Sequence, residues 1–209
     1  MIDGLYKATL DRFWNRLARG LVILGFSANG VTWTGLALAT LVSALYLIHP
    51  NPLLYGCALL LVVTFDALDG AVARITNTCT RYGGYLDAVV DRYQEMIFLL
   101  AIGLVHGYWP ELFLLITGSL LTSYHKARTA IEQPINNNAW PDLLERMERM
   151  ILLGVGLILS QWIETPLLSL GWTRPFLADY LLVLAILTHL TAIQRFLRAR
   201  RLLLKGASD

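Results

Sequence analysis

Long apolar stretches recur along almost the whole chain, and they constrain its fold more than any other feature. Each is close to the ~20 residues that an α-helix needs to cross a bilayer. Hydrophobic residues make up 56% of the 209 residues and charged residues only 15%, which is too apolar for an ordinary soluble domain. We therefore predict an all-α, polytopic integral membrane protein.

Turn-forming and polar segments divide the apolar stretches into six expected transmembrane helices. Such segments occur at 49–52, 75–82, 106–110, 132–141 and 166–175. Helices stop and start at residues of these types. The expected spans are 31–48, 53–74, 83–105, 111–128, 150–163 and 176–196. Without an internal repeat or a second domain, we predict one domain, 1–209, whose six-helix bundle covers 31–200. His106, in one of the turns, is expected to be a solvated loop residue.

The first twenty residues have a different pattern, because their apolar and charged side chains alternate with a helical period. The apolar face is formed by Ile2, Leu5, Tyr6, Leu10, Phe13, Trp14 and Leu17. The other face carries Asp3, Lys7, Asp11, Arg12, Arg16 and Arg19. This pattern predicts an amphipathic helix at 1–20 that lies in the membrane interface. The charges argue against a cleavable signal peptide, which needs a continuous apolar stretch.

The basic residues gather at one side of the expected topology. Of the 17 Lys and Arg, all except Arg92 and Arg174 lie in the amino-terminal helix, the second–third connection, the fourth–fifth connection or the carboxyl-terminal tail. Cytoplasmic segments carry an excess of Lys and Arg. We therefore expect a multi-pass protein of the cell membrane with both termini on the cytoplasmic side.

Four aspartates lie inside these apolar segments, where isolated charges are costly. Asp66 and Asp69 are three residues apart near the end of the second span, and Asp87 and Asp91 are four apart near the start of the third. Each pair therefore shares one helix face, and the short connection allows the two faces to meet. Four convergent carboxylates describe a site for one or two hard divalent cations near the cytoplasmic side.

The full pattern from Asp66 to Asp91 is D-x-x-D-G-x-x-A-R-x8-G-x-x-x-D-x-x-x-D. It resembles the signature of the CDP-alcohol phosphotransferase family, with every fixed position filled at the expected spacing. The alternative is that the aspartates only pair with nearby arginines, namely Arg74, Arg81 and Arg92. Such pairing accounts for the charge but not for the two glycines or the spacing.

The resemblance implies an enzyme of phospholipid biosynthesis. It would transfer a phosphatidyl group from a CDP-activated lipid, CDP-diacylglycerol or an ether-lipid analogue, to a hydroxyl of a polar alcohol and release CMP. The resemblance also implies Mg²⁺ or Mn²⁺ as cofactor, with two ions, and a homodimer. Nucleic acid is not among the expected partners.

The resemblance assigns roles to individual residues by position. The metal ligands would be Asp66, Asp69, Asp87 and Asp91. Asp91 would also be the general base for the incoming hydroxyl. The CDP-lipid would contact Asn29, Thr32, Gly70, Ala73, Arg74 and Thr80. Asn29 and Thr32 match an Asn-x-x-Thr element of the family, although Ala28 replaces the proline that usually precedes it. Ser27 or Asn29 could instead simply cap the first span.

Basic residues at the cytoplasmic ends of the later spans indicate a phosphorylated acceptor, because a phosphate monoester needs charge-assisted partners. They are Lys126, Arg128, Arg149 and Arg195. As an alternative, they only determine topology and snorkel to lipid headgroups. Three segments, Ser-Tyr-x-Lys-Ala-Arg at 123–128, Glu-Arg-x-Glu-Arg at 145–149 and Gln-Arg at 194–195, look similar to the phosphatidylinositol-phosphate synthase branch of the family. This resemblance favours inositol phosphate as acceptor. Met147 replaces the proline usual in that branch, and phosphatidylglycerophosphate synthesis from glycerol 3-phosphate is the nearest rival.

Two other classes of protein fit part of the sequence. Intramembrane carboxylates also occur in ion and proton transporters. A transport route needs polar groups at several depths, whereas the outer halves of the expected spans are almost purely apolar. A non-catalytic membrane scaffold would require a vestigial metal site, yet all four aspartates are present.

Overall fold

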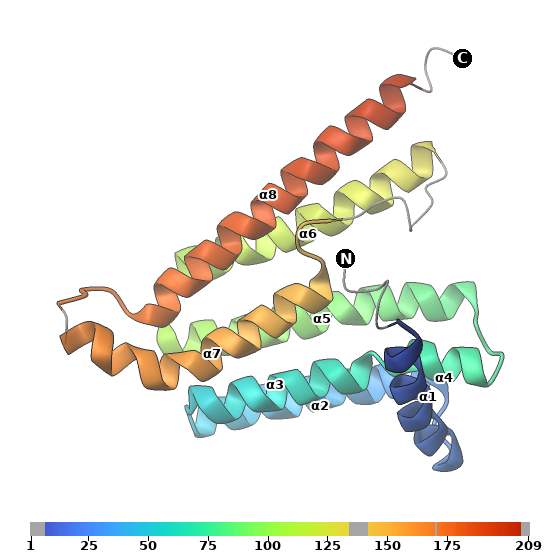
Figure 1. Ribbon diagram of the computed structural model, residues 1–209, viewed down its shortest axis with the longest axis horizontal. Helices are drawn as coiled ribbons and strands as arrows, with labels where there is room; N and C mark the ends of the chain where they lie inside the picture. The colour runs from blue at the N-terminus through green and yellow to red at the C-terminus, as the bar shows by residue number, and fades with distance from the viewer. Residues whose placement is uncertain (1–6, 134–141, 170, 206–209) are drawn as a thin grey trace. The chain divides into compact units, whose positions relative to one another are not determined.

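The computed structural model describes residues 7–133, 142–169 and 171–205, and eight α-helices make up most of this part (Figure 1). They are α1 (Lys7–Ile23), α2 (Ala28–Ile48), α3 (Pro52–Asp66), α4 (Asp69–Ile75), α5 (Arg81–His106), α6 (Trp109–Glu132), α7 (Arg146–Ser169) and α8 (Phe176–Lys205). None of the described residues forms a strand, which confirms the all-α prediction.

Within this described part, three helical segments are long and apolar enough to cross a membrane. They are Ala28–Ile48, Pro52–Ile75 and Phe176–Leu204, and they make the chain compatible with a multi-pass membrane protein. The other three expected spans coincide with α5, α6 and α7. These helices carry more charge, such as Asp87, Asp91 and Arg92 of α5. The six-span count therefore stays a prediction.

The chain forms two compact units. The first comprises Met1–Leu45 and Ala58–Phe98, and the second comprises Tyr46–Cys57 and Leu99–Asp209. Each unit therefore consists of two separate stretches of the sequence. The boundaries between the units fall within α2, α3 and α5.

In the first unit, α1 packs against α4. Their contact is part of a buried apolar cluster formed by Ala18, Val31, Leu68, Ala71 and Val72. Small residues such as Ala18 and Ala71 let helices approach closely. This packing holds in place the helix that begins with Asp69. The interfacial position of the helix predicted at 1–20 stays a prediction, and residues 1–6 of that prediction lie outside the described part.

In the second unit, α8 packs along α6 and α7 (Figure 1). Glycines occupy the closest approaches: a Cβ at Gly118 would lie 3.0 Å from the His189 ring, and one at Gly156 would lie 2.2 Å from the Tyr180 ring. The Tyr180 hydroxyl donates a 2.8 Å hydrogen bond to the Leu152 carbonyl. This unit positions the basic residues of α6, α7 and α8.

Polar side chains cap the helices that carry the predicted site. The hydroxyl of Ser27 accepts a 3.1 Å hydrogen bond from the Gly30 N–H at the start of α2. Thr80 accepts one of 3.0 Å from the Gly83 N–H at the start of α5. These are typical N-cap bonds. Of the two residues that the sequence offered as the cap of the first span, Ser27 makes this bond.

The expectation for His106 was wrong. It is the last residue of α5 and is partly buried, with Nε2 2.6 Å from the Tyr46 hydroxyl. Its ring also stacks on Tyr108, with the ring centroids 5.4 Å apart. These are contacts that only the tertiary fold provides.

Candidate active site

The second expected span is interrupted between its two aspartates. Helix α3 ends at Asp66, and α4 begins at Asp69. At the break, the Leu68 N–H bonds to the Phe65 carbonyl, three residues back, at 3.0 Å. This is the tighter, 3₁₀-type pattern. Residues three apart lie on the same side of such a turn, so the break does not by itself separate Asp66 from Asp69, and their shared face stays a prediction.

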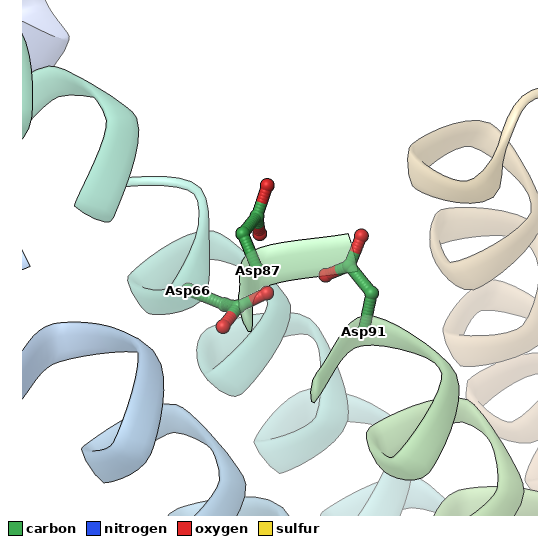
Figure 2. Close-up of side chains that lie close together, drawn as sticks. All are labelled: Asp66, Asp87 and Asp91. Carbon is green, nitrogen blue, oxygen red and sulfur yellow. The ribbon is translucent and has the colours of Figure 1, made fainter. Parts of the chain in front are cut away.

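Asp66 lies close to Asp87 and Asp91, so that α3 and α5 together supply three neighbouring carboxylates (Figure 2). One oxygen from each carboxylate lies within 4.8 Å of the other two. Asp66 is buried, and Asp87 and Asp91 are partly buried. Like charges this close repel one another unless a cation or a proton neutralises them. An all-oxygen donor set of this kind fits a hard divalent cation.

Asp69 makes different contacts. Its Oδ2 accepts a 2.7 Å hydrogen bond from the Thr32 hydroxyl of α2, and its Oδ1 accepts a 2.5 Å bond from the Gly70 N–H. It is not in the group of three carboxylates. The structure thus brings three of the four predicted metal ligands into one group, and the fourth, Asp69, is hydrogen-bonded to α2 and lines the same cavity as Asp87.

A cavity of about 210 Å³ lies beside these groups in the first unit. Its lining contains all six residues that the resemblance assigns to the CDP-lipid: Asn29, Thr32, Gly70, Ala73, Arg74 and Thr80. Asp69 and Asp87 line it as well. Because Asp87 also belongs to the three-carboxylate group, the cavity and the carboxylates form one continuous site.

Gly83 keeps one wall of this cavity open. A Cβ at this position would lie 3.2 Å from the Thr80 hydroxyl and 3.4 Å from Oδ1 of Asn29. Thr80 caps α5 through its hydroxyl and is also one of the residues that line the cavity. The glycine at the fixed position of the pattern thus has a local steric reason.

One of the aspartate–arginine pairs considered in the sequence is present. Oδ2 of Asp91 lies 3.3 Å from Nη1 of Arg92, and both side chains are partly exposed. This ion pair does not explain why the Asp91 carboxylate lies close to those of Asp66 and Asp87. Pairing with arginine alone is therefore an incomplete explanation of the aspartates.

The predicted acceptor cations lie in the second unit and have different environments. Arg149 is 1% exposed, and its Nη2 donates a 2.7 Å hydrogen bond to the Ser119 hydroxyl. Arg128 is exposed and pairs with Glu132 at 2.5 Å, and Lys126 is partly buried. An arginine as buried as Arg149 does not snorkel to a lipid surface, whereas Arg128 can.

Arg195 is also buried, and its surroundings were not predicted. Its guanidinium donates a 2.6 Å hydrogen bond to the Thr122 carbonyl and forms an ion pair with Asp142. The Asp142 side chain is fully buried and lies 3.6 Å from Arg198. Asp142 stands alone in a polar connection, 53 residues from Arg195, and no sequence pattern marks it.

Gln94 is a second residue that sequence reasoning missed. It is fully buried in α5, and its Nε2 donates a 2.8 Å hydrogen bond to Oδ1 of Asp66. The available signal was its spacing, because residue 94 follows Asp91 by three positions and Asp87 by seven. These intervals place all three on one helix face.

Comparison with known proteins agrees with these observations. Residues 26–173 match the family model described as CDP-alcohol phosphatidyltransferase. The chain is 33% identical to phosphatidylinositol phosphate synthase of Mycobacteroides abscessus, over 91% of this chain and 85% of that protein. It is 29% identical to archaetidylinositol phosphate synthase of Pyrococcus horikoshii, over 91% of this chain and 93% of that protein.

The structure also resembles solved structures of Mycobacterium tuberculosis phosphatidylinositol phosphate synthase. The form with CDP-DAG bound superposes with a TM-score of 0.74 at 25% identity, covering 90% of this chain and 94% of that one. A form in complex with manganese and citrate gives the same TM-score, covering 89% and 88%. This chain belongs to the CDP-alcohol phosphatidyltransferase family. It is therefore a phosphotransferase of phospholipid synthesis.

Proposed function

We propose that this enzyme transfers a phosphatidyl group, or its ether-lipid equivalent, from a CDP-activated lipid to a hydroxyl of inositol phosphate and releases CMP. One observation carries the proposal: the residues expected at the CDP end line one cavity, which shares Asp87 with the carboxylate group. Relatives named for inositol phosphate products in a bacterium and an archaeon support the choice of acceptor.

The cofactor in this proposal is Mg²⁺ or Mn²⁺, as two ions. Asp66, Asp87 and Asp91 supply convergent oxygens, and Asp69 completes the set, because each carboxylate oxygen has a further lone pair beyond its present hydrogen bond. When bound, such ions neutralise charge on a pyrophosphate and on the leaving group. The manganese complex of the M. tuberculosis relative is consistent with this choice of cation.

The chain's own residues then have distinct tasks. Asn29, Thr32, Gly70 and Ala73 bind the CDP end of the donor, and Arg74 and Thr80 contact its phosphates. Asp91 accepts the proton of the acceptor hydroxyl. That oxygen forms a bond to the lipid-side phosphorus, the bond from this phosphorus to CMP breaks, and CMP leaves with the bonding electrons.

The acceptor phosphate would bind the cations of the second unit. The Arg149 guanidinium is held by the Ser119 hydroxyl. The Arg195 guanidinium is held by Asp142 and by the Thr122 carbonyl. A guanidinium that is already held in place binds phosphate bidentately at little entropic cost. Lys126 and Arg128 contribute further positive charge.

The proposal also includes the assembly and the location of the enzyme. It is a homodimer in the cell membrane, each chain has six membrane spans, and the active site faces the cytoplasm.

The test is CMP release by the purified protein with Mg²⁺, using CDP-diacylglycerol and its ether-lipid analogue as donors. Inositol phosphate, glycerol 3-phosphate, inositol and serine are offered separately as acceptors. Turnover with inositol phosphate alone is expected. Turnover with glycerol 3-phosphate alone would identify that compound as the acceptor in place of inositol phosphate. Turnover with serine or free inositol would contradict the proposal that the cations bind an acceptor phosphate. Ion flux in liposomes without CDP-lipid would favour a transporter.

A further inference from the structure

One buried hydrogen bond connects the carboxylate group to a residue outside the signature. Gln94 of α5 is 0% exposed, and its Nε2 lies 2.8 Å from Oδ1 of Asp66, which is 3% exposed at the end of α3. On α5, Gln94 continues the face that carries Asp87 and Asp91. The side chain that contacts Asp66 thus lies on the same helix face as its two carboxylate neighbours.

We propose that Gln94 is a positioning residue for the metal site, because its amide holds the Asp66 carboxylate in the orientation that meets Asp87 and Asp91. The inference rests on the proposed metal-dependent function. The last torsion of an aspartate is broad, so the carboxylate alone has no single preferred orientation. Carboxylates that bind metals are themselves hydrogen-bonded, and losing such a partner typically weakens metal binding 10–100-fold.

An amide suits this position better than an acid. A carboxylate only accepts hydrogen bonds, so the group that holds Asp66 must be a donor. A glutamate at position 94 would place a further negative charge beside the carboxylates shown in Figure 2. The neutral amide of Gln94 supplies the donor without adding to their repulsion.

Gly35 of α2 provides an independent observation. A Cβ at this position would lie 2.7 Å from Oδ1 of Asp66 and 3.0 Å from Nε2 of Gln94, both shorter than ordinary contacts. The backbone of α2 therefore closes directly over the hydrogen bond. Glycine is unfavourable in a helix interior, and the close approach gives a reason for it here. Three helices thus meet at this one polar contact.

The experiment measures Mn²⁺ binding to the full-length purified protein by the loss of the electron paramagnetic resonance signal of free Mn²⁺. Gln94→Leu, which keeps bulk without the amide, is expected to weaken Mn²⁺ binding about 10-fold or more. Gly35→Ala, which removes no polar group, is expected to weaken it as well. Gly20→Ala is the matched control, because a Cβ there has nothing within 4 Å, and its Mn²⁺ affinity should equal that of the wild type.

A purely structural role for Gln94 makes a different prediction. The variants would then unfold at lower temperature yet bind Mn²⁺ with wild-type affinity, and that result would overturn the inference alone. If Gln94→Leu does not fold, Gly35→Ala and Gln94→Asn supply the same comparison. If the wild type itself does not bind Mn²⁺, the metal part of the proposed function fails, and the inference with it. In active variants, kcat should fall more than the KM for the CDP-lipid rises.

Discussion

The hydroxyl of Thr32 in α2 donates a 2.7 Å hydrogen bond to Oδ2 of Asp69 in α4, and both residues are buried. The family resemblance assigns Thr32 to the CDP-lipid and Asp69 to the metal. In the structure a hydrogen bond connects the two, so that a residue lining the cavity is the partner of an aspartate of the signature. A substitution at Thr32 therefore changes the Asp69 carboxylate as well as the cavity.

We expect Thr32→Val, which keeps the shape of the side chain, to lower kcat/KM for the CDP-lipid. The Asp69 carboxylate loses the donor that holds it, and each ~1.4 kcal/mol of transition-state stabilisation lost in this way lowers kcat/KM about tenfold. Thr32→Ser retains the hydroxyl and should stay near wild type in the same CMP-release assay. Equal activity of both variants and the wild type would show that the hydrogen bond plays no part in turnover.

Asp91→Asn is expected to abolish CMP release while the protein still folds. The amide cannot accept the proton of the incoming hydroxyl, although it has nearly the same shape. Circular dichroism and size-exclusion chromatography check the fold. Wild-type turnover in this variant would contradict the assignment of Asp91 as the general base.

Arg195→Ala is expected to raise the KM for the phosphorylated acceptor more than the KM for the CDP-lipid. It should also lower stability, because removing one partner of a buried ion pair typically costs about 3–5 kcal/mol. The cost should be smaller here, because Arg198 lies 3.6 Å from Asp142 and still neutralises part of its charge when Arg195 is removed. Initial-rate kinetics with each substrate varied in turn, together with thermal unfolding, measure both effects.

A double variant separates these two effects of Arg195. Arg195→Ala with Asp142→Ala removes both charges of the pair and should recover part of the lost stability, yet it should keep the raised acceptor KM. The same separation can be made for Arg149, which donates a hydrogen bond to Ser119. Arg149→Ala removes the cation, whereas Ser119→Ala removes only its hydrogen-bond partner. Equal increases in both Michaelis constants would argue against an acceptor phosphate site at these residues.

Removal of divalent cations with EDTA should stop CMP release, and Mg²⁺ or Mn²⁺ should restore it. A ligand that binds only the folded state raises its unfolding temperature, so Mn²⁺ should stabilise the wild type against heat. Asp87→Asn removes one of the three convergent carboxylates and should show a smaller rise. Full turnover in EDTA would contradict the metal dependence, whatever the behaviour of the variant.

Much of the helical architecture was predictable from local features. Apolar length and turn residues placed the expected spans 31–48 and 176–196, where the structure has α2 and α8. Helix α8 continues to Lys205, well beyond the expected span, because Arg, Leu and Lys are good helix formers even where the chain is charged. Composition therefore predicts where an apolar helix lies better than where it ends.

The site was predictable only in part, for reasons that particular residues illustrate. The periodicity that placed Asp87 and Asp91 on one face of α5 was reliable because α5 is continuous. For Asp66 and Asp69 the helix breaks at 67–68, so periodicity alone does not determine how these two carboxylates lie. Nothing local in the residue types Asp-Ala-Leu-Asp required that break, since none of them is a strong helix breaker.

The sequence by itself determined the residue types and their spacing, and these were sufficient to indicate the family, the all-α class and the carboxylates available to a metal. Tertiary structure alone decided which group each carboxylate contacts: Asp66 meets Gln94, Asp69 meets Thr32, and Asp142 meets Arg195. The physical reason is that periodicity describes neighbours along one helix. Contacts between residues 28 to 53 positions apart depend instead on how separate helices pack, and no local pattern records that packing.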